Sequence, residues 1–90
     1  MQTVLEAISD PTRRQILNLL KSGEKSAGEL GAKFDISGPS ISHHLRKLKS
    51  ADLVTTLRRG QNIYYTINTS VFDDAVHYVI GFFQNQNKLK

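Results

Sequence analysis

The chain has 90 residues, no cysteine and a formal net charge of +4, so it is sized for one domain, 1–90, without a disulfide framework, a thiolate metal site or a thiol nucleophile. Its longest apolar run, YVIGFF, is too short to span a bilayer, and its N-terminus lacks the basic start and apolar block of a signal peptide. We therefore expect a soluble, cytoplasmic protein.

The first quarter of the sequence predicts two helices. A short apolar stripe favours a helix over Gln2–Ser9. A longer helix follows, because Asp10 can cap its free N–H groups and Pro11 occupies the first turn, where its missing N–H costs nothing. Gly23 is placed to end this helix. The apolar residues are Val4, Leu5 and Ile8 in the first helix, and Ile16, Leu17, Leu19 and Leu20 in the second.

Two further helices, separated by a tight turn, are predicted over residues 26–50. Ser26 and Glu29 have the spacing of a capping box, which starts a short helix at Ser26. After a turn at DIS, Ser37 is suited to cap the helix Gly38–Ser50. The apolar residues of that helix, spaced i, i+4 and i+7, are Ile41, Leu45 and Leu48.

The pattern then changes from helix to strand and back. The β-branched and aromatic runs LVTTLR and NIYYTIN enclose a glycine turn, which predicts a β-hairpin, or wing, over residues 53–68. A last helix is predicted from about residue 70, with Thr69 or Ser70 as its cap. The order α-α-α-α-β-β-α, mainly α with a small β-hairpin, is typical of a winged helix-turn-helix.

The net charge is confined to the second helix of the helix-turn-helix and the hairpin. Residues 36–68 hold five bases and one acid, whereas the remainder of the chain holds seven bases and seven acids. A surface with this bias attracts polyanions, nucleic acid first among them, although a merely solvated basic face is the alternative. The five bases are Arg46, Lys47, Lys49, Arg58 and Arg59.

The face of residues 38–50 opposite the apolar positions is suited to DNA. It presents small hydroxyl side chains, a histidine and two cations, which can bind phosphate oxygens and base edges. The hairpin tip adds arginines that can reach a phosphate or the minor groove. The predicted DNA-binding residues are Ser37, Gly38, Pro39, Ser40, Ser42, His43, Arg46, Lys47, Arg58, Arg59 and Gln61.

The three histidines do not indicate a metal site. His43 and His44 are adjacent, so on a helix they point about 100° apart and cannot easily share an ion. We expect His44 at the boundary of the core, hydrogen-bonded to backbone or to another helix, and His77 has no obvious acidic partner. No nucleophile with a base, no glycine-rich phosphate loop and no paired carboxylates stand out. We therefore predict no enzyme, no catalytic residue, no metal and no cofactor.

The last helix carries two apolar stripes, which suggests a dimer. One stripe can pack on the rest of the chain, and the other would face water in a monomer. We expect that second stripe to pair with a second copy, assisted by the first helix, although both stripes could serve the intrachain core instead. The dimerisation segments are then 1–9 and 70–87. The predicted interface residues are Val4, Leu5, Ile8, Val71, Ala75, Tyr78 and Phe82.

Three segments, AISDPTRRQILNLL, ISGPSISHHLRKLKSADLV and RRGQNIYYTIN, resemble the ArsR family of bacterial winged-helix repressors. The resemblance covers residues 4–85 and implies dimerisation through terminal helices and operator binding, with Ser40, Ser42 and His43 at operator-contacting positions. Members often have glycine in a turn before the first strand. Here Asp52 is expected to take that left-handed turn, which aspartate tolerates better than most residues. Members that sense metals use cysteines before the turn or Asp/His pairs on the last helix, and this chain has neither set.

The patterns SISHHL and GQ-x-IYY are similar to the SdpR-type autorepressor subgroup, which implies a membrane protein that sequesters the repressor. The sequence thus predicts a homodimeric repressor that binds an inverted-repeat operator in double-stranded DNA without metal sensing or a small-molecule substrate. Two alternatives stay open: a winged-helix module that binds proteins but no DNA, and a ligand-responsive sensor with an unrecognised effector site.

Overall fold

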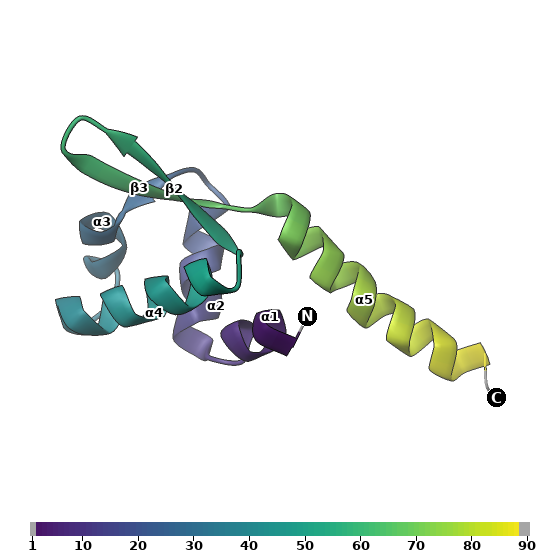
Figure 1. The fold of residues 1–90 in the computed structure, drawn as a ribbon. Coiled ribbons are helices and arrows are strands. Elements are labelled where there is room, and N and C mark those ends of the chain that lie inside the picture. Colours follow the sequence, from purple (N-terminus) through teal and green to yellow (C-terminus); the bar gives the residue numbers. More distant parts are fainter. Residues whose placement is uncertain (1, 89–90) are drawn as a thin grey trace.

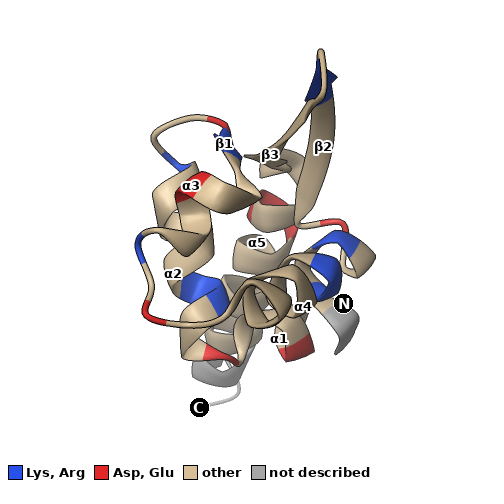
Figure 2. Ribbon diagram, turned by 90° about the vertical axis from the view of Figure 1, so that its left-hand side faces the viewer, with Lys and Arg blue, Asp and Glu red and all other residues tan. Residues whose placement is uncertain are grey.

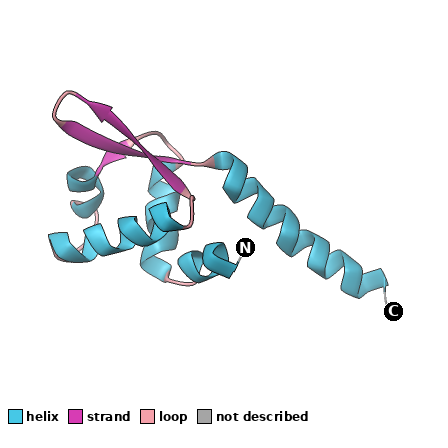
Figure 3. Ribbon diagram, in the orientation of Figure 1, coloured by secondary structure: helices cyan, strands magenta, loops and turns pink. Residues whose placement is uncertain are grey.

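Helices form a compact body under a small sheet in the computed structural model, which describes residues 2–88 (Figure 1). In chain order the elements are α1 (Gln2–Ile8), α2 (Pro11–Leu20), β1 (Lys25–Ser26), α3 (Ala27–Gly31), α4 (Gly38–Ser50), β2 (Val54–Arg59), β3 (Asn62–Ile67) and α5 (Thr69–Lys88). The first four helices lie together beneath the hairpin, whereas α5 extends away from them (Figures 1 and 3). The predicted order of helices and hairpin is confirmed.

The starts of α2, α3 and α4 are fixed by side-chain caps that the sequence predicted. The carboxylate of Asp10 accepts a hydrogen bond from the backbone three residues on, at 3.1 Å. Ser26 and Glu29 form both bonds of a capping box, at 3.1 and 2.9 Å. Ser37 caps α4 with a bond of 3.2 Å. Each cap stabilises its helix by about 1 kcal/mol, because it satisfies N–H groups that have no intrahelical partner.

The hairpin belongs to a three-stranded antiparallel sheet with the order β1-β3-β2. The β2–β3 pairing begins with Val54 opposite Ile67 and continues to the tip. On the other side of β3, the two-residue strand β1 places Lys25 opposite Tyr65. The prediction of a hairpin alone was therefore incomplete, because two residues are too few for alternating apolar and polar positions to show a strand.

Two tight turns position the wing. Gly60 at the hairpin tip has φ 62°, and Asp52 at the end of α4 has φ 60°. The expectation that Asp52 takes a left-handed turn is confirmed. The turn closes α4 with backbone bonds from Asp52 N–H to Lys49 O and from Leu53 N–H to Leu48 O, both 3.0 Å. These bonds direct the chain from α4 straight into β2.

The apolar core lies where α2 and α4 meet α3 and the base of the sheet. All three predicted apolar residues of α4, Ile41, Leu45 and Leu48, are buried, which fixes the opposite face of that helix towards solvent. The largest fully buried side chains are Ile16, Leu30, Leu45, Leu48, Leu53 and Val54.

Only the first turns of α5 pack on this core. Ala75 is 5% exposed and Val71 is half-buried, so the prediction that their stripe faces water was wrong at these two positions. The predicted interface residue Val4 of α1 is likewise buried. The physical reason is that α5 diverges from the other helices towards its C-terminal end. The exposure of an α5 residue therefore depends more on its distance along the helix than on the stripe to which it belongs. Its exposed large apolar residues are Val76, Tyr78, Val79, Ile80, Phe82 and Phe83.

Candidate nucleic-acid interface

The outward face of α4 is polar, cationic and exposed. Gly38 begins the helix in open space, since a Cβ built there would meet no atom within 4 Å. Small residues in this first turn leave room for a groove edge to approach the backbone. All the DNA-binding residues predicted on this helix and at its cap are exposed: Ser37, Gly38, Pro39, Ser40, Ser42, His43, Arg46 and Lys47.

Ser37 has a structural task at the start of this face. Its Oγ accepts a hydrogen bond from the backbone N–H of Ser40 at 3.2 Å. The same Oγ lies 3.1 Å from the Oγ of Ser40. The Ser37 hydroxyl is therefore committed to the cap. It fixes where α4 begins and how the Ser40 side chain is oriented.

His44, unlike His43, turns towards the body. Its Nδ1 lies 3.3 Å from Nη1 of Arg13 and 3.7 Å from Oδ2 of Asp10, and its side chain is 17% exposed. A guanidinium can only donate, so Nδ1 accepts in this contact. The predicted hydrogen bond from His44 to another helix is confirmed. Burial raises the pKa of Asp10, but the backbone N–H of Arg13 and the positive charge of its guanidinium outweigh this effect, so the pKa of Asp10 is lowered overall.

Arg13 is the buried charged residue beneath α4, and sequence reasoning missed it. Its Nε donates to the carbonyl of Ala7 at 2.6 Å, and Nη2 donates to the carbonyl of Glu6 at 3.3 Å. Together with the contact to His44, these bonds tie the end of α1 to α2 and α4. The signal was present, because Arg13 stands three residues before Ile16 and so shares its core-facing side of the helix.

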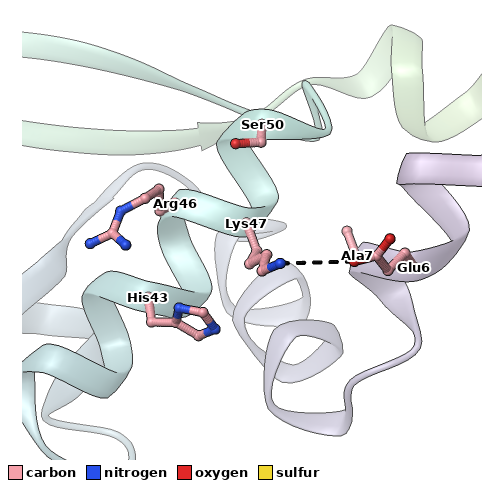
Figure 4. A pocket seen from close by; sticks show the side chains of 6 residues that line it. All are labelled: Glu6, Ala7, His43, Arg46, Lys47 and Ser50. Atoms are coloured by element: carbon pink, nitrogen blue, oxygen red, sulfur yellow. Dashed lines mark ion pairs between the residues drawn. The ribbon is translucent and has the colours of Figure 1, made fainter.

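A hollow of about 280 Å³ lies between α1 and the outward face of α4. Its lining residues are Glu6, Ala7, His43, Arg46, Lys47 and Ser50. Figure 4 shows Lys47 directed across the hollow at Glu6, with Arg46 pointing away to the other side. The Lys47 Nζ–Glu6 Oε1 distance is 3.8 Å. The two neighbouring cations of α4 are therefore not equivalent in the free protein.

The wing places its two arginines on opposite faces of β2, because successive strand residues alternate. Arg59 forms an ion pair with Glu24, and its guanidinium lies 6.0 Å from the ring centroid of Tyr64. Among the side chains that the structure describes, Arg58 has no carboxylate within ion-pair distance. Gln61 is exposed at the turn. Figure 2 shows the cationic segment of the hairpin tip above those of α4.

Two other kinds of site receive no support within residues 2–88. No three His, Cys, Asp or Glu side chains in this range lie close enough together to hold a metal ion. No helix in this range is sufficiently long and apolar to cross a membrane.

The arrangement of these elements defines a class. A short helix (α3), a tight turn, an exposed and capped second helix (α4) and a cationic β-hairpin make this chain a winged helix-turn-helix protein. In proteins of this class the second helix generally lies in the major groove. The chain belongs to the arsR family of bacterial regulatory proteins, whose model matches residues 10–56.

Individual relatives agree with this assignment. The chain is 51% identical over 82 residues to the transcriptional repressor SdpR of Bacillus subtilis (strain 168), which covers 91% of each protein. It is 38% identical over 76 residues to the arsenical resistance operon repressor of Staphylococcus aureus, covering 84% of this chain and 73% of that protein. A solved structure of a possible transcriptional regulator for arsenical resistance superposes with a TM-score of 0.81 at 37% identity, covering 88% and 82% of the two chains.

These similarities confirm the predicted family, fold class and general function. The chain is a DNA-binding transcriptional repressor of the ArsR type and not an enzyme.

Proposed function

We propose that this repressor binds an inverted-repeat operator as a homodimer, with α4 in the major groove, the hairpin tip on the flanking backbone, and no metal effector. The observation that carries the proposal is the two-sided character of α4. Its inner face is buried, and its outer face combines hydroxyls, His43 and cations that are all exposed to solvent. That combination gives phosphate binding and base readout on one rigid element.

The proposed contacts divide by chemistry. Ser40, Ser42 and His43 lie in the first half of α4, where recognition helices contact base edges. Arg46 and Lys47 follow on the same exposed face and are suited to phosphates. Arg58, Arg59 and Gln61 at the wing extend the contact along the backbone or into the minor groove.

The second copy is proposed to pack in the angle between α1 and α5. A hollow of about 210 Å³ lies there, and all of its lining residues are apolar: Val4, Ile8, Leu53, Phe72, Ala75, Val76, Val79 and Ile80. Exposed apolar residues of this number on one helix are typical of an interaction surface. Leu5, Tyr78 and Phe82 do not line this hollow, but their side chains are exposed and are retained as proposed contacts. A two-fold pairing would set the two α4 helices about 34 Å apart, one turn of DNA.

Recovery of the operator is the primary test. Genomic fragments retained by the purified full chain are sequenced, and we expect a common inverted repeat whose half-sites are about one helical turn apart. Retention of random fragments without a shared motif would contradict a specific operator. Retention of no fragment at low salt would instead support a module that binds proteins but no DNA.

The proposed division between base-contacting and phosphate-contacting residues is tested on the recovered duplex and on a scrambled one. Arg58→Ala should weaken binding to both duplexes and lower the salt dependence by about one phosphate contact. Ser40→Ala and His43→Ala should reduce the preference for the recovered sequence. Lys21→Ala, which removes one charge at the exposed end of α2, is the control. Equal losses on both duplexes for all variants would contradict the division.

The dimer is tested by sedimentation of the free protein. We expect a dimer for the wild type and a monomer for Val76→Glu, which places a charge in the apolar hollow. Leu57→Glu on the wing is the matched control, because Leu57 and Val76 are both 41% exposed and only Val76 lines the hollow. A monomeric wild type, or a Val76→Glu variant that stays dimeric, would refute this interface.

We also propose a cytoplasmic location and a membrane protein that sequesters the repressor, supported by the likeness to SdpR. The expected result is that the repressor sediments with membranes only in cells that express such a partner. A repressor that stays in the soluble fraction of those cells would contradict the partner.

A further inference from the structure

Two cations of the proposed interface form ion pairs with carboxylates from the charge-neutral part of the chain. Lys47 of α4 pairs with Glu6 of α1, and Arg59 of the wing pairs with Glu24, which precedes β1. Both acids lie outside the segment 36–68 that carries the net charge. Two of the four cations proposed to contact phosphates are thus partly neutralised in the free protein.

Glu6 is positioned for this contact by its backbone. Arg13 binds the carbonyl of Glu6 and that of the next residue, which holds the end of α1 beside α4. The Glu6 side chain itself is 71% exposed and stands at the rim of the hollow in Figure 4, opposite Lys47. Its carboxylate therefore lies where a phosphate oxygen would meet the same ammonium group, and it can leave without disturbing α1.

Glu24, which pairs with Arg59, is less exposed than Glu6. Its side chain is 26% exposed, and Arg59 also contacts the face of Tyr64. Cation–π contact and ion pair together align the guanidinium along the outer face of the sheet. Arg58, the neighbouring base, lies on the other face without a carboxylate nearby among the described side chains. Among the described side chains of the wing, Arg59 is therefore paired with a carboxylate and Arg58 is not.

We propose that Glu6 and Glu24 act as internal counter-charges, which occupy Lys47 and Arg59 in the free protein and release them when DNA phosphates arrive. This inference rests on the proposed DNA-binding face. Exposed ion pairs contribute up to about 1 kcal/mol, so each pair should weaken DNA binding by roughly two- to five-fold. The same reduction applies to operator and random DNA, so it lowers the affinity for both without changing the preference for the operator.

The test is an anisotropy titration of the full chain with the operator recovered from genomic DNA and with a scrambled duplex of the same length. Glu6→Gln and Glu24→Gln should each bind both duplexes about two- to five-fold more tightly, and the double variant about ten-fold. The gain should shrink at high salt, because exposed charges are screened. Asp74→Asn, an exposed acid on α5, makes the same change in net charge and should have a smaller effect.

A double-mutant cycle separates release of the cation from simple repulsion of DNA by the acid. In a Lys47→Ala background, Glu6→Gln should no longer improve binding, and Arg59→Ala should likewise cancel the effect of Glu24→Gln. A gain that persists in these backgrounds, a gain no larger than that of Asp74→Asn, or a loss of affinity would overturn the inference. A wild-type chain that binds neither duplex would remove the proposed function itself.

Discussion

Replacing Arg13 by alanine tests the tether that joins α1 to α4, which consists of the hydrogen bonds of the Arg13 guanidinium. The variant loses a buried 2.6 Å bond to the carbonyl of Ala7 and weaker contacts to Glu6 O and His44. Hydrogen bonds to charged groups contribute about 1.5–3 kcal/mol each, and an unsatisfied buried carbonyl costs about 1–3 kcal/mol. Relief of the buried charge offsets part of this loss. We expect the free energy of unfolding to fall by about 2–4 kcal/mol.

The neighbouring arginine supplies the control. Arg14 also donates to backbone carbonyls, at 2.8 Å to Ile8 and 3.0 Å to Ser9, but these contacts are exposed. Arg14→Ala should therefore cost less than about 1 kcal/mol. Denaturant unfolding measures both variants, and amide hydrogen exchange should show faster opening of α1 in Arg13→Ala. Equal costs for the two arginines, or unchanged exchange in α1, would refute the tether.

Three local predictions concern turns and caps. Asp52→Gly should raise the free energy of unfolding by up to about 1 kcal/mol, because the φ of 60° favours glycine, and a lower melting temperature would count against this. Ser37→Ala should cost about 1 kcal/mol in denaturant unfolding through loss of the α4 cap, and a cost near zero would show the cap to be unimportant. Asp10 has a lowered pKa, so its charge stabilises the fold above pH 3.8 and this contribution disappears as the pH falls below it. Wild type should exceed Asp10→Asn in stability at pH 7 and match it near pH 2, whereas a constant difference would contradict the assignment.

Helix starts and the exposed face of α4 could be predicted because both depend on neighbours in the chain. A cap needs a side chain and an N–H two or three residues away, as at Ser26 and Ser37. The inner face of α4 follows from the spacing of Ile41 and Leu45, and the outer face is what remains. The left-handed turn at Asp52 was predicted from the family resemblance, in which glycine often occupies that position.

The ion pairs and β1 could not be predicted, because they join residues that are far apart in sequence. Glu24 and Arg59 are 35 positions apart, and nothing in the local pattern links them. The strand β1 exists only because β3 provides a partner for its two residues. The stripes of α5 were predicted as periodic faces, but periodicity does not say how far along its length a helix remains against the body.

The orientation of α4 depends on residues that are not proposed to touch DNA. Within the described residues, Arg13 and the Glu6–Lys47 pair are among the polar links from α1 to α2 and α4. In the proposed dimer, α1 also lies beside the two-fold contact, so these links connect the dimer axis to each recognition helix. A shift of α1 would then move both α4 helices relative to each other, and a spacing matched to one turn of DNA tolerates little such movement. Residues around Arg13 should therefore affect operator spacing before they affect contact with any base.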